Sequence, residues 1–191
     1  MRIEKTILEG CFIIHDTIFK DNRGYFFESF NKKKFEELTG QEIDFVQDNQ
    51  SHSTRGTLRG LHFQKGNYAQ AKLVRVLSGK VLDVAVDIRP DSKTFGQYVA
   101  VELSETSGTQ FFVPRGFAHG FVVLSAQATF FYKCDNYYNK ASEGGIIYND
   151  KDLNIDWSIA DNELILSEKD LQLPSFVETT SSILDFANNL I

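Results

Sequence analysis

The segment "TLRGLHFQ", residues 57–64, places an arginine and a histidine among apolar residues that are typical of a buried strand. The histidine, His62, lies between Leu61 and Phe63 and is one of four histidines in the 191-residue chain. A histidine in such surroundings can be a metal ligand, a proton shuttle or a core residue bonded to a backbone carbonyl. Since its ordinary pKa is about 6.5, it can accept a proton near neutral pH. The segment by itself leaves all three interpretations open.

A metal site has little support from the residues around His62. Zinc and iron sites use three or four nitrogen, sulfur or oxygen ligands. The position that would share its side of a strand is Gln64, and His119 lies far along the chain. Cys11 and Cys134 are too few for a disulfide framework or a zinc site. We therefore expect no metal.

A proton shuttle needs an acid that orients the imidazole, and two aspartates are candidates. Asp83 can contact His62 if its face of a predicted strand lines a cavity. Asp170, in "LSEKD", is the other candidate. Its spacing from Ser167 also resembles a capping box, so the carboxyl group can instead belong to the start of a helix. The pattern does not choose between the two aspartates.

Two further polar residues lie in predicted strands, and each has a structural and a chemical interpretation. Tyr132 shares a face with Phe130 and Cys134, as a packing residue or as an acid. Lys72 begins a predicted strand that otherwise consists of leucine and valine. Burying a lysine ammonium group costs free energy unless it meets an anion or an acid. The alternative is that the side chain extends to the edge of the sheet, where its ammonium group reaches water.

Arginines offer binding sites for an anion, since a guanidinium group binds phosphate through two hydrogen bonds. Arg59 and Arg115 are the candidates in the central part of the chain. Strict strand alternation would place Arg59 and His62 on opposite faces. They can share a face only if Gly60 forms a bulge in the strand.

Most of the segment from Lys72 to Cys134 is predicted to form β-strands. The stretch "KLVRVLSGKVLDVAVDI" alternates on both sides of Ser78-Gly79, which predicts a hairpin. In its second half one face carries Leu82, Val84, Val86 and Ile88, and the other carries Asp83, Ala85 and Asp87. Together with "QYVAVELS", "TQFFVP" and "GFVVLSAQATFFYK", this spacing predicts an antiparallel sandwich or barrel.

Helices are few in the predicted structure. The segment "NKKKFEELTG" predicts a helix with Asn31 as its N-cap and Gly40 at its end. The segment "SSILDFANNLI" predicts an amphipathic helix after Ser182. We expect a single all-β domain with an N-terminal arm (1–50), a barrel core (51–150) and a C-terminal helical tail (151–191).

Composition limits the partners and the compartment. The net charge of −6 argues against nucleic acid, whose binding needs a basic surface. It does not exclude a small anion, because a few well-placed cations outweigh the global charge over the screening length of about 8 Å. The start "MRIEKTILEGCFII" lacks the apolar core of a signal peptide, and no apolar run reaches about 18 residues. We expect a cytoplasmic protein that does not cross a membrane.

Nine segments in order resemble the dTDP-4-dehydrorhamnose 3,5-epimerase family. They are "FKDNRGYFFESF", "FVQDNQS", "LRGLHFQ", "AKLVRVLSGKVLDVAVDIR", "TFG", "VPRGFAHGFVVLS", "YKCDNYY", "IIYNDKDLNIDW" and "LSEKD". The resemblance covers the chain from about Ile3 to Pro174. It implies a metal-free cupin-type jelly-roll barrel, that is, a double-stranded β-helix.

The resemblance also implies roles for four residues. His62 would be the general base, Asp170 would orient it, and Tyr132 would be the acid on the opposite face of the sugar. Lys72 would stabilise the enolate that forms next to the substrate's C4 ketone. The implied reaction inverts C3 and C5 of dTDP-4-keto-6-deoxy-D-glucose, a step in dTDP-L-rhamnose synthesis, and needs no cofactor.

Substrate binding is implied at further positions. By resemblance, the nucleotide-sugar site is lined by Arg23, Glu28, Gln47, Asn49, Arg59, His119, Glu143 and Lys169. Tyr138 would stack on thymine. The family's N-terminal arm crosses to a second subunit, so Arg23 would serve the partner's site in a homodimer.

Two other functions remain open at this point. A related mono-epimerase or ketoisomerase would keep the same base, since the shape of the pocket decides the outcome. A non-catalytic sugar-binding barrel is the third class. The joint presence of His62, Tyr132, Lys72 and Asp170 argues against it, because binding alone needs no matched acid and base.

Overall fold

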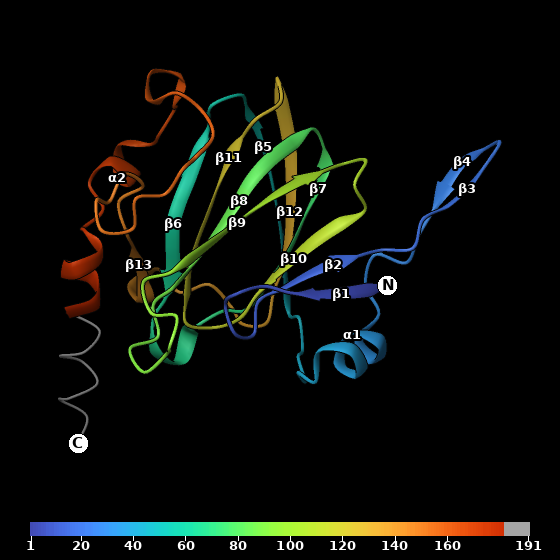
Figure 1. Ribbon diagram of the computed structural model, residues 1–191, viewed down its shortest axis with the longest axis horizontal. Helices are drawn as coiled ribbons and strands as arrows, with labels where there is room; N and C mark the ends of the chain where they lie inside the picture. Colours follow the sequence, from blue (N-terminus) through green and yellow to red (C-terminus); the bar gives the residue numbers. More distant parts are fainter. Residues whose placement is uncertain (182–191) are drawn as a thin grey trace.

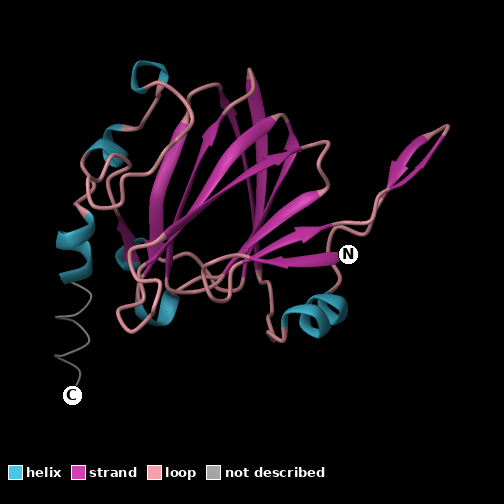
Figure 2. Ribbon diagram, in the orientation of Figure 1, coloured by secondary structure: helices cyan, strands magenta, loops and turns pink. Residues whose placement is uncertain are grey.

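The computed structural model describes residues 1–181, which form a β-barrel of two antiparallel sheets (Figures 1 and 2). The six-stranded sheet has the order β1-β2-β10-β7-β12-β5, and the five-stranded sheet has the order β13-β6-β11-β8-β9. All strand pairs within both sheets are antiparallel. This jelly-roll arrangement confirms the predicted all-β fold.

The bounds of the elements follow chain order. The strands of the six-stranded sheet are β1 (Arg2–Lys5), β2 (Phe12–His15), β5 (Gln47–Thr54), β7 (Lys72–Ser78), β10 (Thr109–Val113) and β12 (Gln127–Cys134). Those of the five-stranded sheet are β6 (Leu58–Gln64), β8 (Lys80–Asp87), β9 (Tyr98–Ser104), β11 (Phe117–Val123) and β13 (Glu143–Gly145). The remaining elements are β3 (Phe19–Asp21), β4 (Gly24–Phe26), α1 (Lys32–Thr39), α2 (Glu168–Leu171), and the 3₁₀ turns η1 (Gly66–Tyr68), η2 (Lys140–Ser142) and η3 (Asp161–Glu163).

Strand β8 is buried on both of its faces, and each face packs against a different part of the chain. The face with Val81 and Ala85 lies in the barrel interior, in the same cluster as Phe121 and Phe130. The opposite face packs against the segment that follows β13, in a cluster that includes Trp157. The described part of the C-terminal segment therefore covers the outer side of the five-stranded sheet, as the position of α2 beside β6 shows (Figure 1).

The hairpin predicted at Ser78-Gly79 is wrong. Strand β7 pairs with β10 and β12, whereas β8 pairs with β9 and β11 in the other sheet. Gly79 has a φ of +82°, and a Cβ added there would lie 2.1 Å from the carbonyl oxygen of Gln127. The glycine therefore forms a tight corner at which the chain changes sheets, and the turn signal does not report strand pairing.

Helix α1 confirms the predicted caps. The side chain of Asn31 accepts a hydrogen bond from the backbone N–H of Lys34, and Gly40 ends the helix in the left-handed conformation. Phe35 is fully buried, and its ring lies 5.0 Å from that of Phe112 on β10. The helix predicted after Ser182 lies outside the described residues.

The hairpin β3–β4 projects away from the barrel (Figure 1). Its aromatic side chains Phe19, Tyr25 and Phe26 are more than 60% exposed. The segment predicted as an arm, residues 1–50, also contains β1 and β2, which are part of the six-stranded sheet. No helix within residues 1–181 has the length and apolar character needed to cross a membrane.

Candidate active site

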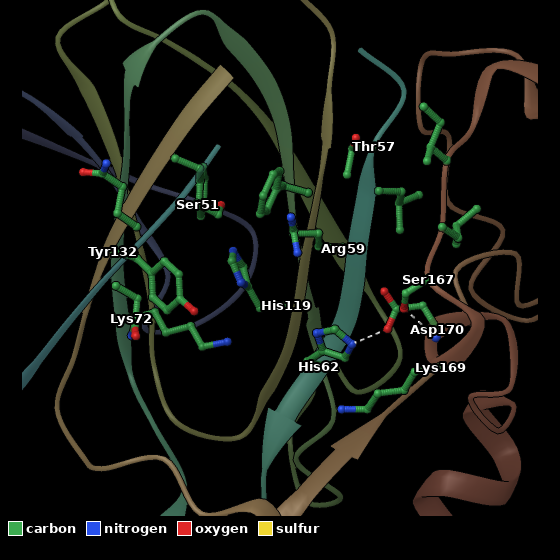
Figure 3. A pocket seen from close by; sticks show the side chains of 17 residues that line it. Ser51, Thr57, Arg59, His62, Lys72, His119, Tyr132, Ser167, Lys169 and Asp170 are labelled. Atoms are coloured by element: carbon green, nitrogen blue, oxygen red, sulfur yellow. Dashed lines mark hydrogen bonds and ion pairs between the residues drawn. The ribbon is translucent and has the colours of Figure 1, made fainter. Parts of the chain in front are cut away.

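A cavity of about 510 Å³ opens between the two sheets and is lined by all four predicted catalytic residues (Figure 3). Strand β6 contributes His62, β7 contributes Lys72, β11 contributes His119 and β12 contributes Tyr132. Asp170 reaches the same cavity from α2, after more than a hundred intervening residues. The site therefore depends on both sheets and on the C-terminal segment.

Asp170 is the acid that contacts His62. Its carboxylate accepts a hydrogen bond from Nε2 of His62 at 2.7 Å, and only 4% of the residue is exposed. The hydroxyl of Ser167 accepts from the backbone N–H of Asp170, so the capping interpretation also holds. Burial opposes the charged form, but hydrogen bonds from His62, Ser167 and the Gly60 backbone hold the pKa of Asp170 below its ordinary value.

A bulge in β6 brings Arg59 and His62 into the same cavity. His62 pairs with His119 and Arg59 pairs with Phe121, so three steps on β6 match two steps on β11. Gly60 has a φ of +129°, and a Cβ added there would lie 2.6 Å from a backbone carbon of β11. Only glycine fits this position, and the bulge that the sequence left open is present in the structure.

Tyr132 and Lys72 come from the six-stranded sheet, across the cavity from His62 on the five-stranded sheet. Burial raises the pKa of Tyr132 to about 12, so its hydroxyl keeps its proton at neutral pH. The Lys72 ammonium lies 5.8 Å from the centre of the Tyr132 ring and points toward the space between Tyr132 and His62 (Figure 3). Burial lowers the pKa of Lys72, which forms no ion pair within residues 1–181.

Asp83 contacts His119 rather than His62. Both of its carboxylate oxygens lie close to Nε2 of His119, at 2.9 and 3.0 Å. Asp83 is completely buried and His119 is 6% exposed. His119 lines the cavity and Asp83 lies behind it, so there are two separate histidine–aspartate pairs, and the acid that contacts His62 is Asp170.

Of the two central arginines, only Arg59 lies in the cavity. Its Nε and Nη2 donate to the hydroxyl of Ser53 at 3.3 and 3.2 Å. No carboxylate pairs with it within residues 1–181, so it can bind an anionic ligand. Arg115 instead forms an ion pair with Asp135 at 2.8 Å and does not line the cavity, so the structure does not support it as a phosphate ligand at this site.

The comparisons with known proteins agree with this geometry. Residues 5–178 match the family model described as dTDP-4-dehydrorhamnose 3,5-epimerase. The chain belongs to the dTDP-4-dehydrorhamnose 3,5-epimerase family. The enzyme of that name from Shigella flexneri is 50% identical over 178 residues, which are 93% of this chain and 97% of the relative.

Solved structures of this epimerase family share the cupin-type barrel. The dTDP-4-dehydrorhamnose 3,5-epimerase of Elizabethkingia anophelis NUHP1 is 59% identical with a TM-score of 0.91, covering 94% of this chain and 98% of its own. The dTDP-6-deoxy-D-glucose-3,5-epimerase of Legionella pneumophila Philadelphia 1 is 48% identical with a TM-score of 0.91, covering 95% and 96%. That structure contains dTDP-4-keto-L-rhamnose.

Five residues expected in the nucleotide-sugar site form a hydrogen-bonded group, of which Asn49 and Lys169 line the cavity and Gln47, Tyr138 and Glu143 do not. The backbone N–H of Tyr138 donates to the side chain of Gln47, and its hydroxyl donates to Glu143, both at 3.1 Å. Lys169 forms an ion pair with Glu143 at 2.6 Å, and Gln47 donates to Asn49 at 3.1 Å. Tyr138 is 52% exposed as a residue, and is therefore accessible to a stacking ligand.

Two expected epimerase site residues lie on the arm and not in the cavity of their own chain. Arg23 forms an ion pair with Asp21 at 2.6 Å, and Glu28 forms one with Lys34 at 2.8 Å. Neither lines the cavity.

Three hydroxyl side chains that line the cavity, those of Ser51, Thr57 and Ser167, are not among the site residues that the sequence predicts (Figure 3). The signal for Ser51 was present, because Asn49, Ser51 and Ser53 alternate along β5 and so share a face. Within residues 1–181, no group of three or more histidine, cysteine, aspartate or glutamate side chains could hold a metal ion.

Proposed function

We propose that this protein inverts C3 and C5 of dTDP-4-keto-6-deoxy-D-glucose, producing dTDP-4-keto-L-rhamnose. The observation that carries the proposal is that His62 and Tyr132 occupy opposite walls of one cavity, with the Lys72 ammonium pointing between them (Figure 3). The product is the ligand of the Legionella structure, which is 48% identical to this chain. An imidazole and a phenol that face each other across a sugar ring supply the base and the acid that inversion requires.

The first step removes a proton from a carbon next to the C4 ketone. Because the Asp170 carboxylate accepts from Nε2 of His62, that nitrogen carries hydrogen and Nδ1 offers the free lone pair. Nδ1 takes the proton, the C–H electron pair forms a C=C bond, and the carbonyl electrons move to oxygen. Lys72 stabilises this oxygen anion, and one such donor contributes about 3–4 kcal/mol.

The second step returns a proton to the opposite face of the same carbon. The Tyr132 hydroxyl donates its proton, the enolate electrons form the new C–H bond, and the ketone is restored. His62 then loses its proton to solvent and the Tyr132 phenolate regains one before the second carbon reacts. Proton transfer beside a ketone changes no oxidation state, so the reaction needs no redox cofactor.

Substrate recognition uses the groups around this centre. Arg59 binds the diphosphate, because it is an arginine in the cavity without a carboxylate partner among the described residues. The exposed ring of Tyr138 stacks on thymine, with Gln47, Asn49, Glu143 and Lys169 beside it. His119 contacts the sugar.

The enzyme works as a homodimer in which the arm completes the partner's site. Arg23 and Glu28 lie on a segment that leaves the barrel, and the exposed aromatic side chains of β3–β4 need a covering surface. Arg23 then adds a second cation to the diphosphate site of the other subunit.

The test is incubation with dTDP-4-keto-6-deoxy-D-glucose in D₂O. We expect deuterium at both C3 and C5, together with inversion at both carbons, seen by NMR. Deuterium at only one carbon would identify a mono-epimerase. Deuterium at neither carbon would support a sugar-binding protein without catalytic activity. The variant His62→Ala is the control, and it should fold normally without exchanging either proton.

A further inference from the structure

Asp83 is a buried carboxylate to which the proposed reaction assigns no role. It lies on β8 opposite Val101 of β9 and Phe121 of β11, which are also buried, and it is 0% exposed. An ionised carboxylate in such surroundings is costly unless it is paired. Its hydrogen-bond partner within residues 1–181 is His119.

The geometry of the pair determines which ring nitrogen of His119 carries hydrogen. Both oxygens of Asp83 lie at hydrogen-bond distance from the same atom, Nε2. An ionised carboxylate only accepts hydrogen bonds, so Nε2 must donate. Burial lowers the pKa of His119, and the charges of Lys72 and His62 act in the same direction, against the Asp83 carboxylate. The neutral ring then has an unprotonated Nδ1.

Nδ1 of His119 is not fully buried, although only 6% of the residue is exposed. Within residues 1–181, the buried side-chain nitrogen or oxygen without a hydrogen-bond partner is Oδ1 of Asp16. Nδ1 of His119 has no hydrogen bond in the same part of the chain, so it must retain accessible surface. His119 lines the cavity, which is where this lone pair is available to a ligand.

An acceptor at this position complements three other groups that line the cavity, namely Lys72, Arg59 and Tyr132. Lys72 and Arg59 only donate hydrogen bonds, and Tyr132 donates its proton in the proposed reaction. The hexose carries hydroxyl groups that need acceptors, whereas the C4 oxygen needs donors. An unprotonated Nδ1 would repel the enolate oxygen and attract a hydroxyl hydrogen.

We propose that Asp83 is a positioning residue that holds His119 as a hydrogen-bond acceptor, so that His119 binds a hydroxyl group of the hexose and leaves the C4 oxygen to Lys72. The proposal rests on the proposed function, because it assumes a nucleotide-linked hexose in the cavity. It assigns the two histidine–aspartate pairs different tasks. The His62–Asp170 pair moves a proton. The His119–Asp83 pair orients the hexose ring from which that proton is taken.

The first measurement needs no substrate. Long-range ¹H–¹⁵N spectra of the ¹⁵N-labelled protein report which nitrogen of each imidazole is protonated, and the His119→Gln variant identifies the His119 signals. We expect Nε2 of His119 to be protonated and Nδ1 to be unprotonated between pH 6.5 and 8.5. A protonated Nδ1 in the wild-type protein at neutral pH would overturn the proposal, even if no variant of Asp83 folds.

The second measurement compares the binding of dTDP with that of dTDP-glucose, which has the hydroxyl groups but no ketone to react. Replacing a carboxylate by an amide can reverse the tautomer of its histidine while leaving the geometry intact. We expect Asp83→Asn to weaken dTDP-glucose binding about ten-fold and dTDP binding less than two-fold. In the His119→Ala background, the same substitution should have no further effect, since Asp83 acts through His119.

Asp87→Asn is the matched control. Asp87 lies on the same face of β8 and is also 0% exposed, but it pairs with Arg89 outside the cavity. The Asp87→Asn substitution should leave the binding of both dTDP and dTDP-glucose unchanged. Equal loss of both ligands in Asp83→Asn, or additivity with His119→Ala, would refute the positioning role. Failure of wild-type protein to bind dTDP would instead refute the proposed function and leave the tautomer result standing.

Discussion

Asp170 and His62 are 108 positions apart in the chain, and Oδ1 of the aspartate lies 2.7 Å from Nε2 of the histidine. The aspartate is carried by the short helix α2, and its backbone N–H is capped by Ser167. Asp170 therefore belongs to the capped first turn of α2 and also orients the imidazole of His62. This contact links the C-terminal segment, which covers the outside of the barrel, to the chemistry inside it.

The contact predicts a pH-dependent loss of stability in Asp170→Asn. The pKa of Asp170 is lowered in the folded protein, so its carboxylate stabilises the fold above its unfolded pKa of about 3.9. This contribution disappears as the pH falls through the lower folded value. We expect the variant to melt at a lower temperature than the wild type at pH 7, and the two melting temperatures to converge in strong acid. Calorimetry from pH 2.5 to 7 tests this, and a constant difference across that range would contradict it.

Tyr132→Phe should separate proton exchange from inversion. The raised pKa of Tyr132, about 12, keeps the hydroxyl protonated, so no loss of activity below about pH 10 should arise from this residue. Without the hydroxyl, His62 can still remove a proton and return one to the same face. We expect kcat for inversion to fall about 10²-fold or more while deuterium still enters from D₂O. NMR measures label and configuration together, and loss of exchange in equal proportion would rule out Tyr132 as the acid.

Gly60→Ala should damage both the fold and the site. A Cβ at this position meets backbone atoms of β11 at 2.6 and 2.9 Å, and φ is +129°. Relief requires β6 and β11 to separate, so we expect a loss of about 3 kcal/mol in the free energy of unfolding. Gly24→Ala is the control for the conformation alone, because it also has a positive φ but no neighbour within 4 Å. Urea denaturation should show a clearly smaller loss for Gly24→Ala, and equal losses would mean that the contact with β11 is unimportant.

Mixing two inactive variants tests the exchange of arms between subunits. If Arg23 serves the partner's site, a dimer of one Arg23→Ala subunit and one His62→Ala subunit contains one complete site. Random exchange makes half of the dimers mixed, so activity should recover to about a quarter of the wild-type value. Gel filtration with light scattering confirms the dimer. No recovery in a mixture shown to exchange subunits would place Arg23 in the site of its own chain or outside any site.

The strand pattern of this chain was readable because it is local. The alternation along β8 correctly separated Val84 and Val86 from Asp83 and Ala85, since successive side chains of a strand must point to opposite faces. The caps of α1 were readable for the same reason, because a side chain three residues away satisfies the first backbone N–H groups.

Strand pairing was not readable from the same pattern. Gly79 marks a turn in either case, but the hydrogen bonds of β7 and β8 go to strands that are distant in the sequence. A turn residue reports that the chain changes direction and does not report which partner the next strand finds. The predicted hairpin failed for this reason.

By itself, the sequence determined the all-β class, the faces of the strands and the caps of α1, and its motifs pointed to the candidate catalytic groups. Only the tertiary structure decided that Asp170 contacts His62 while Asp83 contacts His119, and that a bulge brings Arg59 beside His62. The reason is physical. Backbone geometry constrains neighbours along the chain, whereas contacts between distant residues depend on how two sheets and a covering segment pack together.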